Sequence, residues 1–423
     1  MFLIHGNIID TSAERKFNTL QNGYLAIDCG KICGIYSNNT LPNEFKNCEI
    51  FNYNDKLVIP GLTDIHVHAP QYTFRGLGMD MELLDWLNTY TFPEEAKYSQ
   101  ISYANNAYTK FVDDLRKSPT TRACIFATIH MGATYMLMDL LEKSGLVTMV
   151  GKVNMDRNSP DYLVESTEQS INDTKNWVET SKKTYKNTLP IVTPRFIPSC
   201  TDGLMNALSD IRNEYKIGLQ SHLSENPSEV AWVKELCLDS RNYLEAYKNR
   251  NSLCKSDIKT IMAHCVYCVD DEISLLKKHD VYVAHCPQSN ANLSSGIAPL
   301  RKYIKKRLNI GLGSDIAAGQ SLNMLDVTAD AVAVSKLYWR YIDNSQEPLS
   351  TSESFYLATR GGGSYFGKVG AFEKGYDADV VIIDDSQIRT KSYDSLEQRI
   401  TRAVYLNCEC EITAKFVKGN KLF

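Results

Sequence analysis

Short apolar runs rich in β-branched residues alternate, through the middle of the chain, with longer stretches of helical composition. Eight of these runs are candidate strands, at residues 62–68, 122–130, 147–156, 190–196, 218–225, 260–264, 281–285 and 309–315. Their near-continuous hydrophobicity is typical of parallel strands that are buried on both faces. Because helical stretches separate them, each strand is expected to reach the next through a crossover helix. The pattern predicts an α/β fold built on a (β/α)8 TIM barrel.

The two ends of the chain follow a different pattern. Short β-rich pieces separated by glycine turns occur at residues 23–27, 30–36, 379–383 and 412–417. Neither end alone has enough strands for a stable sheet. We therefore expect residues 1–58 plus 366–423 to form one small β-sandwich domain beside a catalytic barrel of residues 59–365.

The composition is that of an ordinary globular protein. The chain has 423 residues, of which 43% are apolar and 23% charged, and this balance allows a large buried core. The 46 Lys and Arg residues against 50 Asp and Glu leave a net charge of −4. A near-neutral balance gives no electrostatic reason to expect nucleic acid or an anionic membrane as a partner.

The cysteine content and the apolar runs of the sequence indicate the cellular compartment of the protein. Twelve cysteines in 423 residues are too few for a disulfide scaffold. The first residues, MFLIHGNIID, lack the features of a signal peptide, and no run approaches the ~18 apolar residues of a membrane span. These features predict a cytoplasmic protein with free thiols. Cys265 and Cys268 form a lone CxxC without a second pair at zinc-ribbon spacing.

Most of the histidines stand where predicted strands end. Six of the eight, and one aspartate, occupy such positions: His66, His68, His130, His222, His264, His285 and Asp315. In a (β/α)8 barrel these strand ends converge on one mouth, where active sites form. The sequence therefore directs many possible ligands to one place.

The first two of these histidines suggest a metal site. His66 and His68 are two apart on a strand, so their side chains face the same way and can share one ion, although hydrogen-bonded core histidines give the same pattern. His222 and Asp315 complete a ligand set suited to zinc or ferrous iron, with a position open for water. His264 either binds the metal or orients the water.

The chemistry expected of such a centre is hydrolysis. A bound metal lowers the pKa of its water from 15.7 towards about 7, so hydroxide is available at neutral pH. Glu225 lies in the loop that follows His222, where its carboxylate is placed to pass the water proton to a substrate; the alternative is a surface loop glutamate. Asp315 is a candidate to take a second proton while it remains a ligand.

Longer motifs resemble the amidohydrolase superfamily over most of the chain. These motifs are PGLTDIHVHAPQY (60–72), LDWL (84–87), YTFP (90–93), FATIH (126–130), TPRF (193–196), SHLSE (221–225), MAH (262–264), HCPQSN (285–290) and GLGSD (311–315). Within the superfamily they are most similar to the guanine deaminase family, because Ala-Pro-Gln after the second histidine and Pro-Arg-Phe at strand four resemble that family's purine contacts. The resemblance implies hydrolytic deamination of guanine to xanthine and ammonia, and a homodimer.

The resemblance also implies roles for individual residues. The ligands of a single zinc ion, with ferrous iron as the alternative, would be His66, His68, His222 and Asp315. Glu225 would be the proton shuttle and His264 would lie beside the hydroxide, while the purine pocket would contain Gln71, Arg195 and Phe196 together with His222 and Glu225. No lysine stands at the end of strand four, where two-metal relatives carry a bridging modified lysine, and this favours one ion.

Each purine contact has a physical rationale and an alternative. Arg195 is able to donate to O6 of guanine, an acceptor that adenine lacks, or to form a structural ion pair. Phe196 is able to stack on the ring or to pack in the core. Gln71 offers a donor and an acceptor to a purine edge, or orders its own loop.

Two other functions stay open at this point. A related aminohydrolase or chlorohydrolase would act on cytosine, a pterin, a thiolated adenosine or an aminotriazine. A catalytically silent relative would serve as an assembly scaffold. Such scaffolds typically lose ligands, whereas every proposed ligand is present in this sequence.

Overall fold

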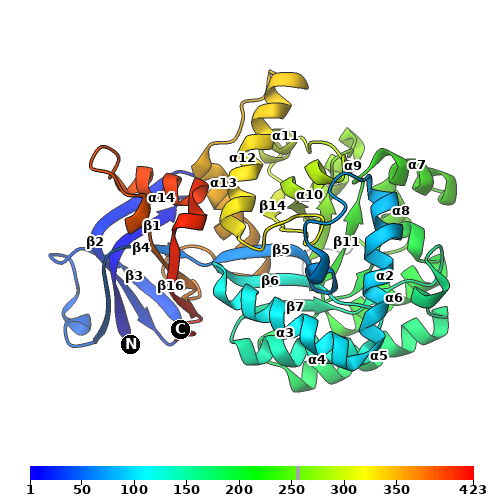
Figure 1. Cartoon of the computed structure of the whole chain (residues 1–423), viewed down its shortest axis with the longest axis horizontal. Coiled ribbons are helices and arrows are strands. Elements are labelled where there is room, and N and C mark those ends of the chain that lie inside the picture. Colours follow the sequence, from blue (N-terminus) through cyan, green and yellow to red (C-terminus); the bar gives the residue numbers. More distant parts are fainter. Residues whose placement is uncertain (254–257) are drawn as a thin grey trace.

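The computed structural model describes residues 1–253 and 258–423 and has two parts (Figure 1). A barrel of parallel strands and helices takes up the middle of the chain. A separate sheet contains strands from both ends of the chain, and both termini lie in it. The predicted α/β barrel with a domain built from both termini is confirmed.

The barrel has eight strand positions arranged in two halves. One half is β5 (Leu62–His68), β6 (Thr120–Phe126), β7 (Val147–Gly151) and β9 (Thr188–Pro190), and the other is β11 (Leu219–Leu223), β12 (Thr260–His264), β13 (Tyr282–His285) and β14 (Asn309–Leu312). The short strands β8 (Val153–Asn154) and β10 (Thr193–Pro194) continue the third and fourth positions. The backbone amide of Val192 donates to Gly218 O at 2.9 Å, and that of Asp315 donates to His66 O at 2.8 Å. These bonds join the two halves, so the barrel closes.

The observed strands match the eight predicted runs, with differences at their ends. The second strand stops at Phe126, so His130 lies beyond the strand, at the start of a helix, and its predicted position at a strand end is wrong. The third and fourth predicted strands are each broken into two short pieces. In the fourth, Arg195 and Phe196 follow the last paired residue and therefore stand in the loop at the barrel mouth.

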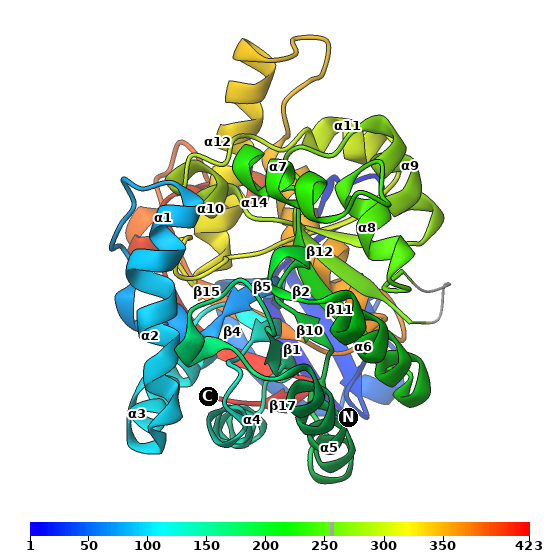
Figure 2. The ribbon, with the colours of Figure 1, turned by 90° about the vertical axis from the view of Figure 1, so that its right-hand side faces the viewer.

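Helices link and cover the barrel strands (Figure 2). They are α1 (Leu83–Trp86), α2 (Phe92–Ala96), α3 (Ile101–Lys117), α4 (Met131–Ser144), α5 (Thr167–Thr184), α6 (Asp202–Tyr215), α7 (Pro227–Leu236), α8 (Tyr243–Asn249), α9 (Asp270–Lys278), α10 (Pro287–Asn292), α11 (Leu300–Lys305), α12 (Met324–Tyr341) and α13 (Thr351–Tyr356). Helix α3 buries Ala104, Tyr108 and Phe111, a spacing that gives a helix one apolar face. No helix in the described ranges has both the length and the apolar character needed to cross a membrane.

The terminal domain is organised around one seven-stranded sheet. Its strands are β1 (Phe2–Thr11), β2 (Phe17–Asp28), β3 (Lys31–Tyr36), β4 (Glu49–Pro60), β15 (Val380–Asp384), β16 (Glu411–Val417) and β17 (Asn420–Lys421), in the order β17-β16-β15-β4-β1-β2-β3, and helix α14 (Leu396–Tyr405) joins β15 to β16. The N-terminal β4 pairs directly with the C-terminal β15. The sheet is consistent with the predicted β-sandwich, and the boundaries at 58/59 and 365/366 stay a prediction.

A buried arginine connects the barrel to the terminal domain. Arg122 on β6 donates from Nε to Asp379 Oδ2 at 2.6 Å and from Nη2 to Asp377 Oδ2 at 2.8 Å. Both acceptors stand just before or at the start of the C-terminal strand β15. Since the guanidinium is buried, it needs these carboxylates to offset its loss of water.

This contact predicts a stability effect. Arg122→Ala leaves buried Asp379 without its cation, and we expect the free energy of unfolding, measured by urea denaturation, to fall by about 3–5 kcal/mol. The matched control is Arg241→Ala, because Arg241 pairs with Glu245 on the surface. The control should lose less than about 1 kcal/mol. Equal losses in the two variants would contradict the role of Arg122.

Candidate metal centre and active site

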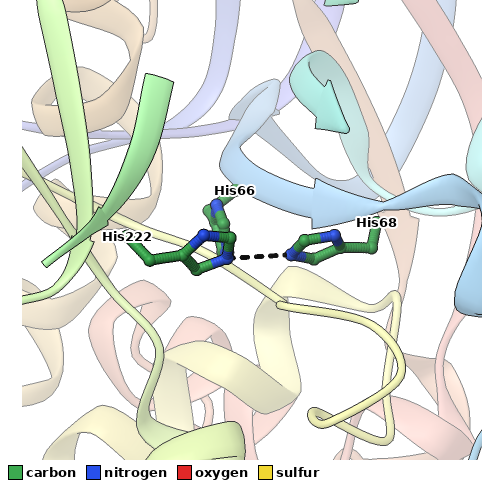
Figure 3. A group of neighbouring side chains, drawn as sticks. All are labelled: His66, His68 and His222. Atoms are coloured by element: carbon green, nitrogen blue, oxygen red, sulfur yellow. Dashed lines mark hydrogen bonds between the residues drawn. The ribbon is translucent and has the colours of Figure 1, made fainter. Parts of the chain in front are cut away.

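Two histidines from the first barrel strand and one from the fifth meet at the mouth of the barrel. His66 and His68 stand on the same face of β5, and His222 approaches from β11 (Figure 3). The Nε2 atoms of His68 and His222 are 3.2 Å apart. One nitrogen from each of the three rings falls within 4.8 Å of the others. The structure therefore brings together the three imidazoles expected to share an ion.

Asp315 reaches the same centre from the segment after β14. Its Oδ1 lies 3.2 Å from His66 Nε2 and 3.5 Å from His68 Nε2. A Cβ at Gly313 would stand 2.8 Å from the Cβ of His66, so only glycine allows the segment to pass this close to β5. Buried Asp64 also ties the two together, because its carboxylate accepts from Ser314 N and Oγ and from His66 N.

The orientation of His222 is set by its own backbone surroundings. Its Nδ1 lies 2.7 Å from the carbonyl oxygen of Arg195. A carbonyl only accepts, so Nδ1 carries the proton and Nε2 presents a lone pair to the centre. This is the tautomer that a metal ligand requires.

His264 and Glu225 lie next to each other at the mouth of the barrel, beside Asp315. His264 Nδ1 is 2.9 Å from Asn290 Oδ1, which fixes the ring, and its Nε2 lies 3.3 Å from Glu225 Oε2 and 3.7 Å from Asp315 Oδ2. Ser295 Oγ donates to Glu225 Oε1 at 3.3 Å. His264 therefore stands between the two carboxylates to which the sequence assigned proton transfer.

The donor set fits a metal ion. Nε2 of His66 and Nε2 of His264 are buried, and neither has a hydrogen-bond partner among the residues that the structure describes. Ligand atoms at about 2.0–2.1 Å from a zinc ion stand roughly 3.3 Å apart in a tetrahedron, close to the spacing of the His68 and His222 nitrogens. An ion together with its bound water would pair these buried lone pairs, which are otherwise costly.

Burial and neighbouring groups shift the pKa values of the site residues in different directions. Burial, followed by repulsion from neighbouring His66, lowers the pKa of His68 and of His222 well below its usual value, so both rings are neutral. Burial and the charge of Asp315 raise the pKa of Glu225 well above its usual value. Burial also opposes ionisation of Asp315, but its interaction with His66, and then with His264, holds its pKa well below the usual range. The pKa values of two carboxyl groups at one centre are thus shifted in opposite directions, which suits acid–base chemistry.

A cavity of about 420 Å³, part of it open to solvent, lies over this centre. Eight of the nine predicted site residues line it: His68, Gln71, Arg195, Phe196, His222, Glu225, His264 and Asp315. His66 is fully buried beneath them. His285, the last residue of β13, is also fully enclosed.

The walls of the cavity include residues that the sequence did not single out. Leu83, Trp86 and Leu87 come from the segment between β5 and α3, Glu229 from α7, and Leu293 and Ala318 from later loops. A further residue, Glu95 on α2, lies behind the wall and pairs with Arg195. The LDWL and YTFP motifs mark this segment in the sequence, but neither indicates which side chains face the cavity.

The chain resembles known proteins over most of its length. The sequence pattern that defines the amidohydrolase family matches residues 57–422. The chain belongs to the amidohydrolase family. Among curated relatives of this amidohydrolase, guanine deaminase of Dictyostelium discoideum is 40% identical over 381 residues, or 88% of the chain and 84% of the relative. Guanine deaminase of Rattus norvegicus is 39% identical over 393 residues, or 89% and 86% of the two chains.

A solved structure resembles this amidohydrolase over its whole length. It is guanine deaminase from C. acetobutylicum with guanine bound in the active site. The two chains are 44% identical, the match covers 100% of each, and the TM-score is 0.96. The family assignment and the His/His/Asp centre together make this a metal-dependent hydrolase.

The metal centre predicts a thermal effect. Chelation should leave the buried nitrogen lone pairs unsatisfied and lower the Tm by roughly 5–15 °C, measured by calorimetry before and after addition of metal. The variant His66→Ala should show no such shift. The matched control His5→Ala, whose ring contacts Asn52 in the terminal domain, should respond as the wild type does. An unchanged Tm after complete metal removal would contradict the assignment.

Proposed function

We propose that this amidohydrolase is a guanine deaminase, which hydrolyses guanine to xanthine and ammonia in purine catabolism. The observation that carries the proposal is the cavity in which the metal-binding side chains and the proposed purine contacts Gln71, Arg195 and Phe196 face the same space. The relatives and the guanine-bound neighbour support the choice of substrate.

In the proposed complex the purine is held at its edges and on its face. Arg195 and Gln71 stand together on one side of the cavity, where they present hydrogen-bond groups to O6 and the adjacent ring edge. Phe196 is largely buried and packs edge-on to Trp232, with centroids 6.1 Å apart. Its position in the wall makes it a rigid apolar surface for a planar ring.

The reaction replaces one bond at C2 of guanine. The oxygen of water bonds to C2, the bond from C2 to the exocyclic nitrogen breaks, and ammonia leaves. Glu225, whose pKa is raised by burial and by the charge of Asp315, passes a proton to N3 and takes one from the attacking water. Ionised Asp315 is placed to accept the second proton and pass it to the leaving amine.

We propose a single zinc ion, held by His66, His68, His222 and Asp315, with ferrous iron as the alternative. When bound, the ion supplies an activated water and stabilises negative charge that develops on the ring. His264 orients the water through its fixed ring. The only lysine near the ends of strands three and four in the described structure is Lys152, and it pairs with Glu165 at 2.5 Å. It is therefore not free to bridge two ions.

The proton-shuttle role predicts a loss of turnover without loss of metal. Glu225→Gln should lower kcat for ammonia release from guanine by roughly 10²–10⁴-fold, because the amide cannot carry the proton. Metal content, measured by elemental analysis, should stay at one ion per chain. The matched control Glu235→Gln changes a glutamate at the exposed end of α7 and should behave as the wild type. Turnover near the wild-type value in Glu225→Gln would refute the role.

We also propose that the enzyme is a cytoplasmic homodimer. The cysteines in the described part of the chain are free thiols, which supports a reducing compartment. The end of α12 stands away from the barrel in both ribbon views (Figures 1 and 2). It exposes 48% of Leu337, 80% of Tyr341 and 59% of Ile342. Basic Arg340 and acidic Asp343 flank these side chains, and a two-fold arrangement would allow Arg340 of one copy to face Asp343 of the other.

The proposed interface predicts a change of oligomeric state. Tyr341→Glu combined with Ile342→Glu should convert the dimer to a monomer in sedimentation equilibrium, because the charges would face each other across the two-fold axis. Leu238→Glu is the control, since Leu238 is 90% exposed on a different part of the barrel. A wild-type monomer, or a dimer that survives the double substitution, would rule out this interface.

A further inference from the structure

Glu95 is almost completely buried beside the purine cavity, with 1% of its surface exposed. Both of its carboxylate oxygens are engaged by residues of the cavity wall. Oε2 accepts from Arg195 Nη1 at 2.6 Å, and Oε1 accepts from Arg195 Nη2 at 3.2 Å and from Gln71 Nε2 at 3.0 Å. One carboxylate thus contacts both of the polar side chains proposed to read the purine.

Helix α2 holds Arg195 from two directions. Phe92 and Glu95 are three residues apart and therefore lie on the same face of the helix. The guanidinium carbon of Arg195 lies 5.2 Å from the centre of the Phe92 ring, while the Glu95 carboxylate pairs with the two terminal nitrogens. Arg195 follows the fourth barrel strand, and α2 follows the first, so this contact connects opposite parts of the mouth.

The same carboxylate fixes the orientation of the Gln71 amide. Gln71 Oε1 accepts from the backbone amide of Ala317 at 3.1 Å, and Nε2 donates to Glu95. A reversed amide would place two donors against each other at Ala317 and two acceptors against each other at Glu95. One N–H and one lone pair of Gln71 are left for a ligand, and their positions are fixed.

The negative charge of Glu95 matters more than the orientation of its partners, because it neutralises Arg195. Arg195 is a permanent cation that is buried in the wall of the cavity. The bidentate ion pair cancels that charge in a place where water does not screen it. A cavity without Glu95 would contain an uncompensated cation and would attract anions.

We propose that Glu95 is a positioning residue that makes the cavity selective for neutral oxopurines over anionic ones. It neutralises Arg195 and orients both Arg195 and Gln71 towards the purine edge. The inference rests on the proposed function, since it concerns the same purine site. It gives the cavity a preference for neutral ligands, which the direct contacts to the substrate alone do not explain.

The test compares binding of two oxopurines by calorimetry, which needs no turnover. Urate is a monoanion at neutral pH and hypoxanthine is neutral. Wild-type enzyme should bind hypoxanthine more tightly than urate. Glu95→Gln should strengthen urate binding and weaken hypoxanthine binding, so that the ratio of the two Kd values shifts by about tenfold or more towards urate. In guanine turnover the same variant should raise KM more than it lowers kcat.

Two further variants make the result specific to charge. Arg195→Gln leaves the Glu95 carboxylate unpaired and should shift the ratio the opposite way, against urate. Glu94→Gln is the matched control, because Glu94 contacts Thr73, Lys97 and Tyr103 instead of the cavity wall, and it should leave the ratio unchanged. The Arg195 variant carries the test if Glu95→Gln does not fold.

The outcomes separate the two proposals. Wild-type enzyme that binds these purines but releases no ammonia from guanine would refute the proposed function and leave the charge comparison intact. An unchanged Kd ratio in both Glu95→Gln and Arg195→Gln would overturn the role of Glu95, as would wild-type enzyme that binds neither purine. An equal loss for both ligands in Glu95→Gln would assign Glu95 a structural role only.

Discussion

The hydrogen bonds between β5 and the segment after β14 are the constraint on which the centre depends. Asp315 N donates to His66 O, His68 N donates to Ile316 O, and the Asp64 carboxylate holds Ser314. These bonds close the barrel. They also bring residues from near the start and the end of the barrel sequence to within ligand distance of each other. Closure of the fold and assembly of the metal site are therefore one event.

Around these hydrogen bonds the protein excludes water from the site, and neighbouring groups compensate each buried charge. Burial lowers the pKa of His68 and of His222, the pKa of Asp315 is held below its usual range, and burial beside Asp315 raises the pKa of Glu225. In the same cavity Arg195 is matched by Glu95. The cavity thus contains fixed dipoles and balanced charges before any ligand arrives, and such preorganisation is what stabilises a developing charge during reaction.

Local pattern predicted most of the barrel and its ligands, for a clear physical reason. Parallel strands buried on both faces have continuous apolar runs, and their carboxyl ends meet at one mouth, so His66, His222 and Asp315 were placed by strand position alone. His130 was misplaced because apolar residues continue beyond the last paired residue of β6. The strands β1 and β4 were not predicted individually, because neither shows the regular apolar–polar alternation of a half-exposed strand. Strand β1 is buried along most of its length, and β4 is polar and exposed over its first part but buried over its last. Glu95 was missed because two successive glutamates in a short helix look alike in sequence, and only the distant Arg195 distinguishes them.

The pairing of β4 with β15 has a consequence for biosynthesis. Strand β15 stands inside the terminal sheet, with β4 on one side and β16 on the other, and Asp377 and Asp379 beside it neutralise Arg122 of the barrel. A ribosome has therefore synthesised the whole barrel sequence before β4 and β15 can pair. Until then β4 presents an unpaired edge, which is a template for wrong association between nascent chains. The edge of β4 therefore stays unpaired for as long as the intervening barrel sequence takes to be synthesised.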